Sequence, residues 1–423
     1  MKKMTLLTAA LLSVSMSQMA SANDDKVWTV TQQIAQSTQR VAVLPFIGNN
    51  ALSSAITAKL DTTELGATQN NLPQQTNNSN EILSNLNAWR NQGFGYVVIG
   101  QAHSIAGGKT AITYEVIDAI NGKSLGGAQT HITDSDPIAI NRTSAQLSDK
   151  IYQAITGQAS DFGSKIAYVE NTGTPSAPIA TLKIIDSDGK NARTLYTVNG
   201  SILTPTFSPD GSQLAYSVQR QNGLPVIQIQ SVNGGESRVV TPFWGHNLAP
   251  SFSPDGTSIL FSGSHENNDP NIYRLNLSLN TLERLTNLNG AENSPNYLPN
   301  NQGFIFTADQ GSRRQGLYRQ NFGNQTATPL IANATNPRLS HDGSKIVYVA
   351  GSRIVIANTQ GKTEQSFAAS GTEISASLSP SGNQLVYALS QGKQSQLMIR
   401  NLHNNSTRAI ATTGQVRDPI WSK

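Results

Sequence analysis

The sequence predicts a mainly β protein: a six-bladed β-propeller, whose C-terminal strand closes the first blade, preceded by a small N-terminal α/β domain. Three observations carry this prediction. A turn motif recurs from residue 164 to the end of the chain, each copy is followed by short strands of alternating polarity, and the two ends of the repeated region complement each other. A period near 40 residues with several strands per repeat is typical of propeller blades.

Residues 1–22 have the features of a secretory signal peptide. Lys2 and Lys3 precede an apolar run that includes residues 6–12, and residues 20–22 supply the small-x-small pattern of a cleavage site. An apolar core of about eleven residues is shorter than the ~20 that cross a bilayer as a helix. We therefore expect a mature chain that starts at Asn23 and is exported in soluble form, with an uncleaved anchor as the weaker alternative.

Composition narrows the chemistry. The chain has no cysteine, which excludes disulfides, a lipid-modified cysteine at the cleavage site and thiolate metal sites. Residues 161–423 carry 20 basic and 16 acidic side chains, and residues 23–160 carry 8 and 10. The excess of basic residues in the predicted propeller gives a weak field, not the basic stripe of a nucleic-acid binder. We expect no nucleic-acid partner.

Residues 39–160 predict the α/β domain. Within it, residues 40–46 and 95–100 are typical of buried strands. Residues 51–65 have the apolar spacing of a helix, and residues 82–89 predict a second helix.

The rest of this domain predicts a hairpin and a closing helix. Residues 111–117 and 125–132 flank the dipeptide Asn121-Gly122, a strong two-residue turn signal. The closing helix is expected to begin with Thr143 as its N-cap and to end at Gly157.

The repeated motif is a proline, two residues and a Ser-Pro-Asp-Gly turn. Its first turn residue stands at positions 208, 253, 298, 340 and 379, with a partial copy at 422. Proline presets φ for the second turn position, aspartate can bond its own backbone, and glycine adopts the left-handed conformation that closes the hairpin. Each repeat also offers a third strand, such as residues 271–275, and a fourth, such as residues 283–286, so we expect four strands per blade.

The ends of the propeller region, residues 161–423, predict ring closure. The region opens with a second-strand element, residues 164–168, that lacks its own preceding proline-containing strand. The chain finishes with such a strand, residues 418–422. Pairing the two completes six blades and leaves no open radial edge. A two-sheet sandwich is the alternative, and the complementary ends favour the propeller.

One catalytic pattern is present but lacks its context. Residues 122–126 fit G-x-S-x-G, the nucleophile elbow of α/β-hydrolases, which needs a strand before it and a helix after it. Here a hairpin turn precedes Ser124 and a strand follows, so a plain turn is the better interpretation. The six histidines are scattered without the i, i+4 spacing of a zinc site, and no glycine-rich phosphate loop occurs. We expect neither catalytic residues nor a metal nor a cofactor.

Candidate contact residues come from the loops that enter the innermost strands, which gather on one face around the central channel. The richest is the loop 242–248, with Phe243, Trp244 and His246. Exposed aromatic side chains on a loop are typical of a contact patch, although Trp244 could instead pack between two blades. Residues of mixed charge, which suit a protein partner, are expected on the same face: Glu292, Asn293, Arg313, Arg314 and Arg417.

The Ser-Pro-Asp-Gly hairpins, without the Trp-Asp ending of WD repeats, resemble those of the TolB family, as does the order of signal peptide, small α/β domain and six blades. The resemblance covers nearly the whole mature chain, including residues 41–46, residues 95–100 and the blade turns. It implies a periplasmic, non-enzymatic component of the Tol–Pal envelope complex. Such a component supports outer-membrane integrity and constriction during cell division.

The resemblance also implies two protein partners for a monomer that does not span the membrane. The peptidoglycan-associated lipoprotein Pal would bind the loop face, at Leu203, Thr204, Trp244, His246, Asn293 and Arg313. The C-terminal domain of the inner-membrane protein TolA would bind the mature N-terminal segment, residues 23–38, at Asp24, Lys26, Val27, Trp28 and Val30. Residues 27–30 have strand propensity and could add to the edge of a partner's sheet.

Two other functions stay open on the sequence alone. A generic periplasmic propeller scaffold shares every feature derived from the residues. A propeller-type hydrolase would need a converging metal or acid–base set around the channel, which the scattered histidines do not supply.

Overall fold

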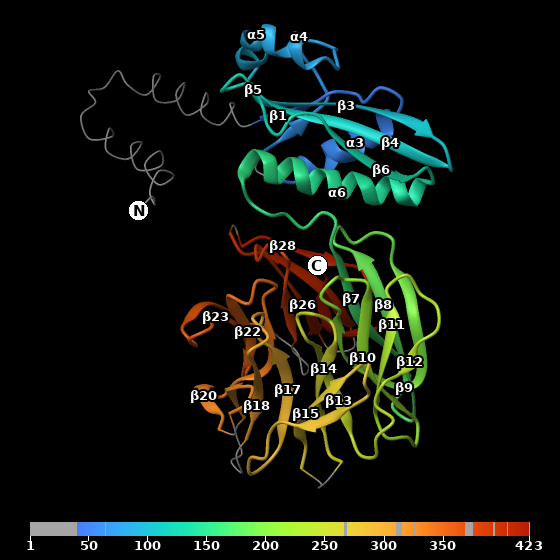
Figure 1. Ribbon diagram of the computed structural model, residues 1–423, viewed down its shortest axis with the longest axis vertical. Coiled ribbons are helices and arrows are strands. Elements are labelled where there is room, and N and C mark those ends of the chain that lie inside the picture. The colour runs from blue at the N-terminus through green and yellow to red at the C-terminus, as the bar shows by residue number, and fades with distance from the viewer. Residues whose placement is uncertain are drawn as a thin grey trace, which may run out of the picture. The chain divides into compact units, whose positions relative to one another are not determined.

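The computed structural model describes residues 40–422, apart from residues 64, 266–268, 310–314, 325, 369–374, 392–393 and 404 (Figure 1). The chain divides into two compact units, the first ending at Gln158 and the second beginning at Ala159. Among the described residues, no helix is long and apolar enough to cross a membrane.

The first unit is an α/β domain with one mixed sheet. Its strands run in the order β2-β1-β3-β4-β5. β6 also pairs with β4, at residues 109–114, whereas β5 pairs with residues 117–118. β1 is parallel to β2 and β3, whereas β3, β4 and their later neighbours are antiparallel. The strands are β1 (Arg40–Val43), β2 (Ala67–Thr68), β3 (Phe94–Ile105), β4 (Lys109–Asp118), β5 (Lys123–Ser124) and β6 (Gln129–Asp134), and the helices are α3 (Asn50–Leu60), α4 (Ser79–Ser84), α5 (Leu86–Asn91) and α6 (Pro137–Thr156).

Both predicted buried strands are present, as β1 and β3. The helix predicted over residues 51–65 is present as α3. The single helix predicted over residues 82–89 is wrong, because α4 ends at Ser84 and α5 begins at Leu86, with Asn85 between them as the cap of both. Trp89 of α5 is fully buried and packs edge-on against Phe94 at 6.1 Å between ring centroids.

Two details of the closing elements differ from expectation. The hairpin across Asn121-Gly122 forms, but its second strand is split into β5 and β6 around Gly126 and Gly127. α6 starts earlier than predicted: Asp136 is its N-cap, accepting hydrogen bonds from the amides of Ile138 and Ala139, and proline follows at the first helical position. Thr143 is buried within the helix, and Gly157 is the C-cap, as predicted.

The second unit is all β. Its described strands form one seven-stranded sheet, β12-β11-β10-β9-β8-β7-β29, and four four-stranded sheets in chain order, β13–β16, β17–β20, β21–β24 and β25–β28. The strands of the large sheet are β7 (Lys165–Thr174), β8 (Ala177–Asp186), β9 (Arg193–Phe207), β10 (Gln213–Arg220), β11 (Val226–Ser231), β12 (Arg238–Val239) and β29 (Gln415–Trp421).

The remaining strands are short and all antiparallel to their neighbours. They are β13 (Asn247–Phe252), β14 (Ser258–Gly263), β15 (Asn271–Asn276), β16 (Leu282–Arg284), β17 (Glu292–Tyr297), β18 (Gly303–Ala308), β19 (Gly316–Asn321), β20 (Thr328–Ile331), β21 (Thr335–Leu339), β22 (Lys345–Ala350), β23 (Arg353–Asn358), β24 (Thr363–Ala368), β25 (Ala376–Leu378), β26 (Gln384–Gln391), β27 (Gln394–Asn401) and β28 (Thr407–Ile410).

The seven-stranded sheet is two blades that share the long strand β9. Residues 193–199 of β9 pair with β8, and residues 200–207 pair with β10. The first half therefore completes blade one (β29, β7, β8, β9), and the second half starts blade two (β9–β12). With the four separate sheets as blades three to six, the described strands make six blades of four strands each.

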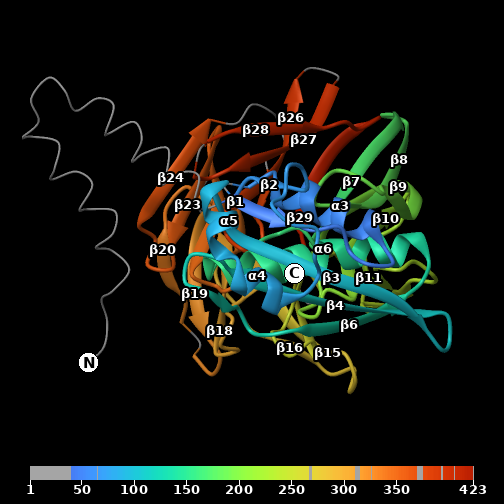
Figure 2. The ribbon, with the colours of Figure 1, turned by 90° about the horizontal axis from the view of Figure 1, so that it is seen from above.

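The innermost strands close into a ring. β9, β13, β17, β21, β25 and β29 each contact the next, and β29 contacts β9 again. β29 pairs antiparallel with β7, as the complementary ends predict. Figure 2 follows the blades from β8 and β9, past β15 and β18, to β27 and β28, which return to β7. The predicted propeller with its terminal strand in the first blade is confirmed.

The repeated turn is held by the residues that the motif supplies. In the first complete copy, Ser208 Oγ donates to Asp210 Oδ1 at 2.6 Å, and the amide of Gln213 donates to Ser208 Oγ at 2.9 Å. Gly211 has a φ of +69° and its amide closes the turn onto the carbonyl of Ser208 at 2.9 Å. Because successive side chains of each strand point to opposite faces, every blade packs its apolar residues against both neighbouring blades.

Candidate functional site: the loop end of the central channel

The channel is lined by bulges in the inner strands. Five inner strands contain a residue with positive φ directly before a proline: Thr204, Ala249, Ser294, Asn336 and Asp418. The strand pairing shifts register at each of these places. Positive φ is unfavourable for residues other than glycine, and a bulge of this kind redirects side chains at a site. All five residues line one small cavity of about 30 Å³ between the inner strands.

Two charged side chains, Asp418 and Arg338, line this cavity. Asp418 Oδ2 accepts a hydrogen bond from the amide of Thr204 at 3.1 Å and from Arg417 Nε at 3.2 Å. Arg338 lines the same cavity from β21. Burial lowers the pKa of its guanidinium, and the carboxylate of Asp418 acts in the opposite direction. The two charges therefore compensate each other at this cavity.

Three of the predicted contact residues lie at or next to the residues that line this cavity. Leu203 and Asn293 directly precede positive-φ residues on β9 and β17, and Thr204 is itself one of those residues. β9 and β17 both contact β13, the strand that follows the Trp244 loop, so these residues stand on neighbouring inner strands. All three are partly exposed. The structure thus brings Leu203, Thr204 and Asn293 together on neighbouring inner strands of the propeller.

The loop before β13, residues 242–246, is fixed by hydrogen bonds to its neighbours. The amide of His246 donates to Ser264 Oγ at 3.0 Å, and His265 Nδ1 lies 2.7 Å from the carbonyl oxygen of Trp244. The buried side-chain amide of Asn247 donates to three carbonyls, those of Pro225, Phe243 and Gly245, at 3.1 to 3.2 Å.

Phe243 is the aromatic residue that packs between blades. Its ring stacks on Phe261 at 6.5 Å between centroids and meets His265 edge-on at 5.4 Å. His265 in turn packs on Tyr273 at 4.5 Å. These rings belong to or adjoin the core between blades two and three.

Trp244 points away from that core. Its side chain is 82% exposed, the largest exposed fraction among the described large apolar residues, and His246 is exposed beside it. Of the two interpretations left open by the sequence, packing between the blades is wrong for Trp244 and right for its neighbour. The loop holds a bare indole on a rigid support, which is the arrangement of an interface anchor.

Glu292 was expected on this face and is instead buried. Its side chain is fully inaccessible, Oε2 accepts a hydrogen bond from Thr286 Oγ1 at 2.9 Å, and Oε1 has no hydrogen-bond partner. Burial raises the pKa of this carboxyl to about 7, opposed by the hydrogen bond from Thr286 and by Arg284. Polarity alone suggested exposure, but the blade encloses this residue beside Thr286 and Ser262.

Several predicted residues lie outside the described part of the chain. They are Arg313 and Arg314 on the loop face, and Asp24, Lys26, Val27, Trp28 and Val30 in the N-terminal segment. Ser124 of the G-x-S-x-G pattern ends the two-residue strand β5 and accepts a hydrogen bond from the amide of Gly127. Within the described ranges, no group of three or more histidine, aspartate or glutamate side chains could hold a metal ion.

Known proteins match this arrangement. The family model described as the TolB beta propeller domain matches residues 152–423. A Tol-Pal system protein TolB from Thioalkalivibrio sulfidiphilus is 31% identical over 168 residues, which cover 40% of this chain and 37% of that protein. The protein of the same name from Actinobacillus succinogenes is 29% identical over 227 residues, 51% of each. The chain thus spans about a third to a half of the length of these curated relatives.

A solved structure extends the match to most of the chain. The crystal structure of TolB from Acinetobacter baumannii aligns with a TM-score of 0.75 and 31% sequence identity, covering 90% of this chain and 96% of that one. Because the propeller model covers well over half of the sequence and the solved relative nearly all of it, the chain belongs to the TolB family.

Proposed function

We propose that this protein is a periplasmic, non-enzymatic component of the Tol–Pal envelope complex. In this proposal it links Pal at the outer membrane to the C-terminal domain of TolA at the inner membrane, as a monomer within the complex. Membership of the TolB family supports the placement in this complex. Residues 1–22 would direct export and be removed.

The observation that carries the proposal is the exposed Trp244 on a loop pinned by Asn247, Ser264 and His265. A large aromatic side chain on a preorganised support loses little conformational entropy on binding. Together with His246, Leu203, Thr204 and Asn293 around the channel, it offers a patch that fits a protein surface. We propose that Pal binds there and that Arg313 also contributes to Pal binding.

The test is capture of purified Pal by variants of the loop face. Replacing Trp244 by alanine should weaken Pal binding by ~30-fold or more, the loss expected when an interface hot spot is truncated. The matched control is Leu279→Ala, because Leu279 is also a large exposed apolar residue of the propeller, 72% exposed, but lies in the turn between β15 and β16. Equal affinity of both variants for Pal would refute the loop-face site.

The second half of the proposal concerns residues 23–38. The strand propensity of residues 27–30 supports docking as an added strand on TolA, with contacts from Asp24, Lys26, Val27, Trp28 and Val30. Deleting residues 23–33 should abolish capture of the TolA C-terminal domain and leave Pal binding unchanged. TolA capture that survives this deletion would exclude the segment as the contact.

A further inference from the structure

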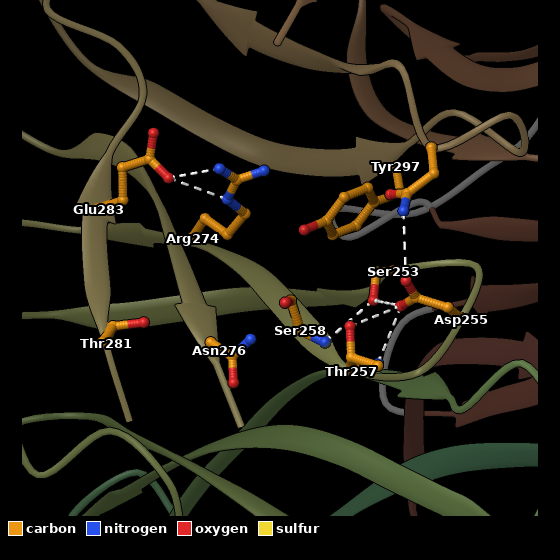
Figure 3. Close-up of a pocket in the computed structure, with 10 residues that line it drawn as sticks. Ser253, Asp255, Thr257, Ser258, Arg274, Asn276, Thr281, Glu283 and Tyr297 are labelled. Carbon is orange, nitrogen blue, oxygen red and sulfur yellow. Dashed lines mark hydrogen bonds and ion pairs between the residues drawn. The ribbon is translucent and has the colours of Figure 1, made fainter. Parts of the chain in front are cut away.

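A polar pocket lies on the flank of blade three, and its volume is about 300 Å³ (Figure 3). Blade three lines it with residues of the turn 253–258 and of β15 and β16, and blade four adds Tyr297 and Asn301. The turn follows the end of β13, whereas the Trp244 loop precedes its start, so the pocket and the loop stand at opposite ends of that strand. Its volume reaches the lower end of the range of small-molecule sites.

The pocket coincides with a departure from the blade repeat. In every blade, one residue of the third strand stands opposite one residue of the fourth at the same place in the repeat. In blades one, two and six this pair is an isoleucine and an arginine: Ile184 with Arg193, Ile229 with Arg238 and Ile399 with Arg408. The other three blades depart from this pair: blade three has Arg274 with Glu283, blade four Arg319 with Thr328 and blade five Ile356 with Gln365.

The contact between blades three and four at this pair therefore differs from the contact between other blades. Elsewhere, Arg193 donates to the carbonyl of Val232 and Arg408 to that of Ser187, each on the next blade. Glu283 cannot donate such a bond. Arg274 pairs with Glu283 on its own blade, with 3.0 Å between Nε and Oε2, and its guanidinium reaches blade four, where it lies over the ring of Phe322 at 4.8 Å.

The aspartate of the blade-three turn keeps one oxygen available. Asp255 Oδ1 accepts hydrogen bonds from Ser253 Oγ, from the amide of Thr257 and from Thr257 Oγ1 at 2.6 to 3.0 Å. In the turns of Asp210 and Asp342 the corresponding hydroxyl bonds Oδ2 at 2.7 Å instead. Asp255 Oδ2 is left with one long hydrogen bond, from Asn301 Nδ2 at 3.3 Å. It is therefore free to accept from a ligand.

Figure 3 shows how these groups surround the space. The Arg274–Glu283 pair and the side chains of Asn276 and Thr281 stand on one side, the ring of Tyr297 reaches in from blade four, and Asp255 lies beyond it. Arg274 and Glu283 neutralise each other, and Asp255 leaves the lining with one negative charge, so the pocket offers many donors and acceptors and disfavours an anionic ligand. Tyr297 is only 7% exposed, so the lining is almost wholly polar. This combination suits an uncharged ligand with many hydroxyl groups.

We propose that the pocket between blades three and four binds a short neutral saccharide. Asp255 and Glu283 accept from sugar hydroxyls, and Arg274 and Asn276 donate to sugar oxygens. The site is independent of the Pal and TolA contacts proposed above, because it uses none of their residues.

The test restores the repeat. The double variant Arg274→Ile, Glu283→Arg recreates the pair of blades one, two and six and should let an arginine span the cleft. Its matched control is Arg319→Ile, Thr328→Arg, which makes the same exchange at the equivalent pair of blade four. Binding of chitobiose and of maltose to the purified protein is followed by saturation-transfer NMR and titration calorimetry, with calcium chloride and glycylglycine as non-saccharide probes.

At least one disaccharide should bind the unaltered protein at millimolar concentration. The blade-three variant should weaken that binding by about tenfold or more, the value of one or two lost polar contacts, while the blade-four variant keeps it. Thr281→Val, which changes one exposed hydroxyl, should weaken binding without affecting folding and covers the case of an unfolded double variant. Binding of neither disaccharide, binding of calcium or glycylglycine in their place, or undiminished binding by the variants that fold would overturn the proposal.

Discussion

Trp421 Nε1, on the last strand, donates a buried hydrogen bond of 2.6 Å to Ser164 Oγ, which directly precedes the first strand of the propeller. The backbone adds a second link, because the amide of Ser422 donates to the carbonyl of Lys165 at 2.7 Å. Trp421 also belongs to the apolar core between blades six and one, with Tyr168 and Val386. The side chain of Trp421 therefore joins the two ends of the ring in two ways, by its hydrogen bond to Ser164 and by its packing in this core.

Replacing Trp421 by phenylalanine should destabilise the ring. The variant loses the indole donor and leaves a small void, which together should lower the free energy of unfolding by about 2 kcal/mol. Urea unfolding followed by circular dichroism measures this change. Trp244→Phe is the control, because its side chain is exposed and should shift unfolding by less than about 0.5 kcal/mol. Equal midpoints for the two variants would contradict this account of closure.

Glu170 makes a second link between the first strand of the propeller and the segment that leads into β29. Its carboxylate is buried in β7, pairs with Lys183 and accepts hydrogen bonds from the amides of Thr413 and Gly414 at 2.8 and 2.9 Å. Burial acts to raise its pKa, but the hydrogen bonds from Lys183, Thr413 and Gly414 outweigh it and hold the pKa below the usual 4.5.

Glu170→Gln should therefore cost about 2 kcal/mol at neutral pH, the value of hydrogen bonds to a charged group. Because the pKa is lowered by folding, this stabilisation is present above pH 4.5 and is lost as the pH falls through the folded-state value. The gap between the variant and the unaltered protein should thus narrow on acidification, as melting temperatures measured across pH would show. Glu364→Gln, in the exposed pair with Lys345, should show a much smaller gap at every pH.

The sequence predicted what is determined locally and repeated. The blade turn is determined by Ser208, Asp210 and Gly211 alone. Six copies of it along the chain showed the length of the blade repeat. The start of α6 was missed, although Asp136 followed by proline carried a local signal for it. The break between α4 and α5 at Asn85 has no comparable signal in the pattern of apolar residues.

Features set by a neighbouring blade could not be predicted in this way. Whether Phe243 or Trp244 turns inward depends on Phe261 and His265, which reach the loop only once the blades are assembled. Glu292 is buried because the blade encloses it beside Thr286, whereas its polarity favoured the surface. The pocket on blade three needed the strand register, since only the register shows that Arg274 faces Glu283.

Glu292 should make stability fall with rising pH. Its pKa is raised from 4.5 to about 7 on folding, so its protonated form stabilises the fold fully below pH 4.5, and this contribution is lost as the pH rises through about 7. The difference corresponds to ~3 kcal/mol at most, at ~1.4 kcal/mol per pKa unit. Glu292→Gln should therefore be more stable than the unaltered protein at pH 8 and similar to it at pH 4.5.

Urea unfolding at several pH values tests this prediction. Glutamine keeps an oxygen that can accept from Thr286 Oγ1, so the variant removes the charge without removing that contact. Glu236→Gln, at an exposed position of blade two, is the control and should follow the unaltered protein at every pH. A variant that loses stability equally at pH 4.5 and pH 8 would show that the charge of Glu292 is not what matters.

Gly245 should be required for the rigidity of the Trp244 loop. Its φ is +86°, and a Cβ atom there would lie 2.5 Å from the carbonyl oxygen of Ser264, so alanine must displace the loop from β14. Gly323 is a matched control, because its φ is +82° but a Cβ atom would meet nothing within 4 Å. Both alanine variants bear the strain of a left-handed residue, about 1 kcal/mol, and only Gly245→Ala adds the clash with Ser264.

Hydrogen exchange of the His246 amide, which donates to Ser264 Oγ, should accelerate by roughly tenfold or more in Gly245→Ala and stay unchanged in Gly323→Ala. Unchanged exchange in both would mean that the loop is held without this close approach, and that the exposed indole owes its position to Phe243 and Asn247 alone.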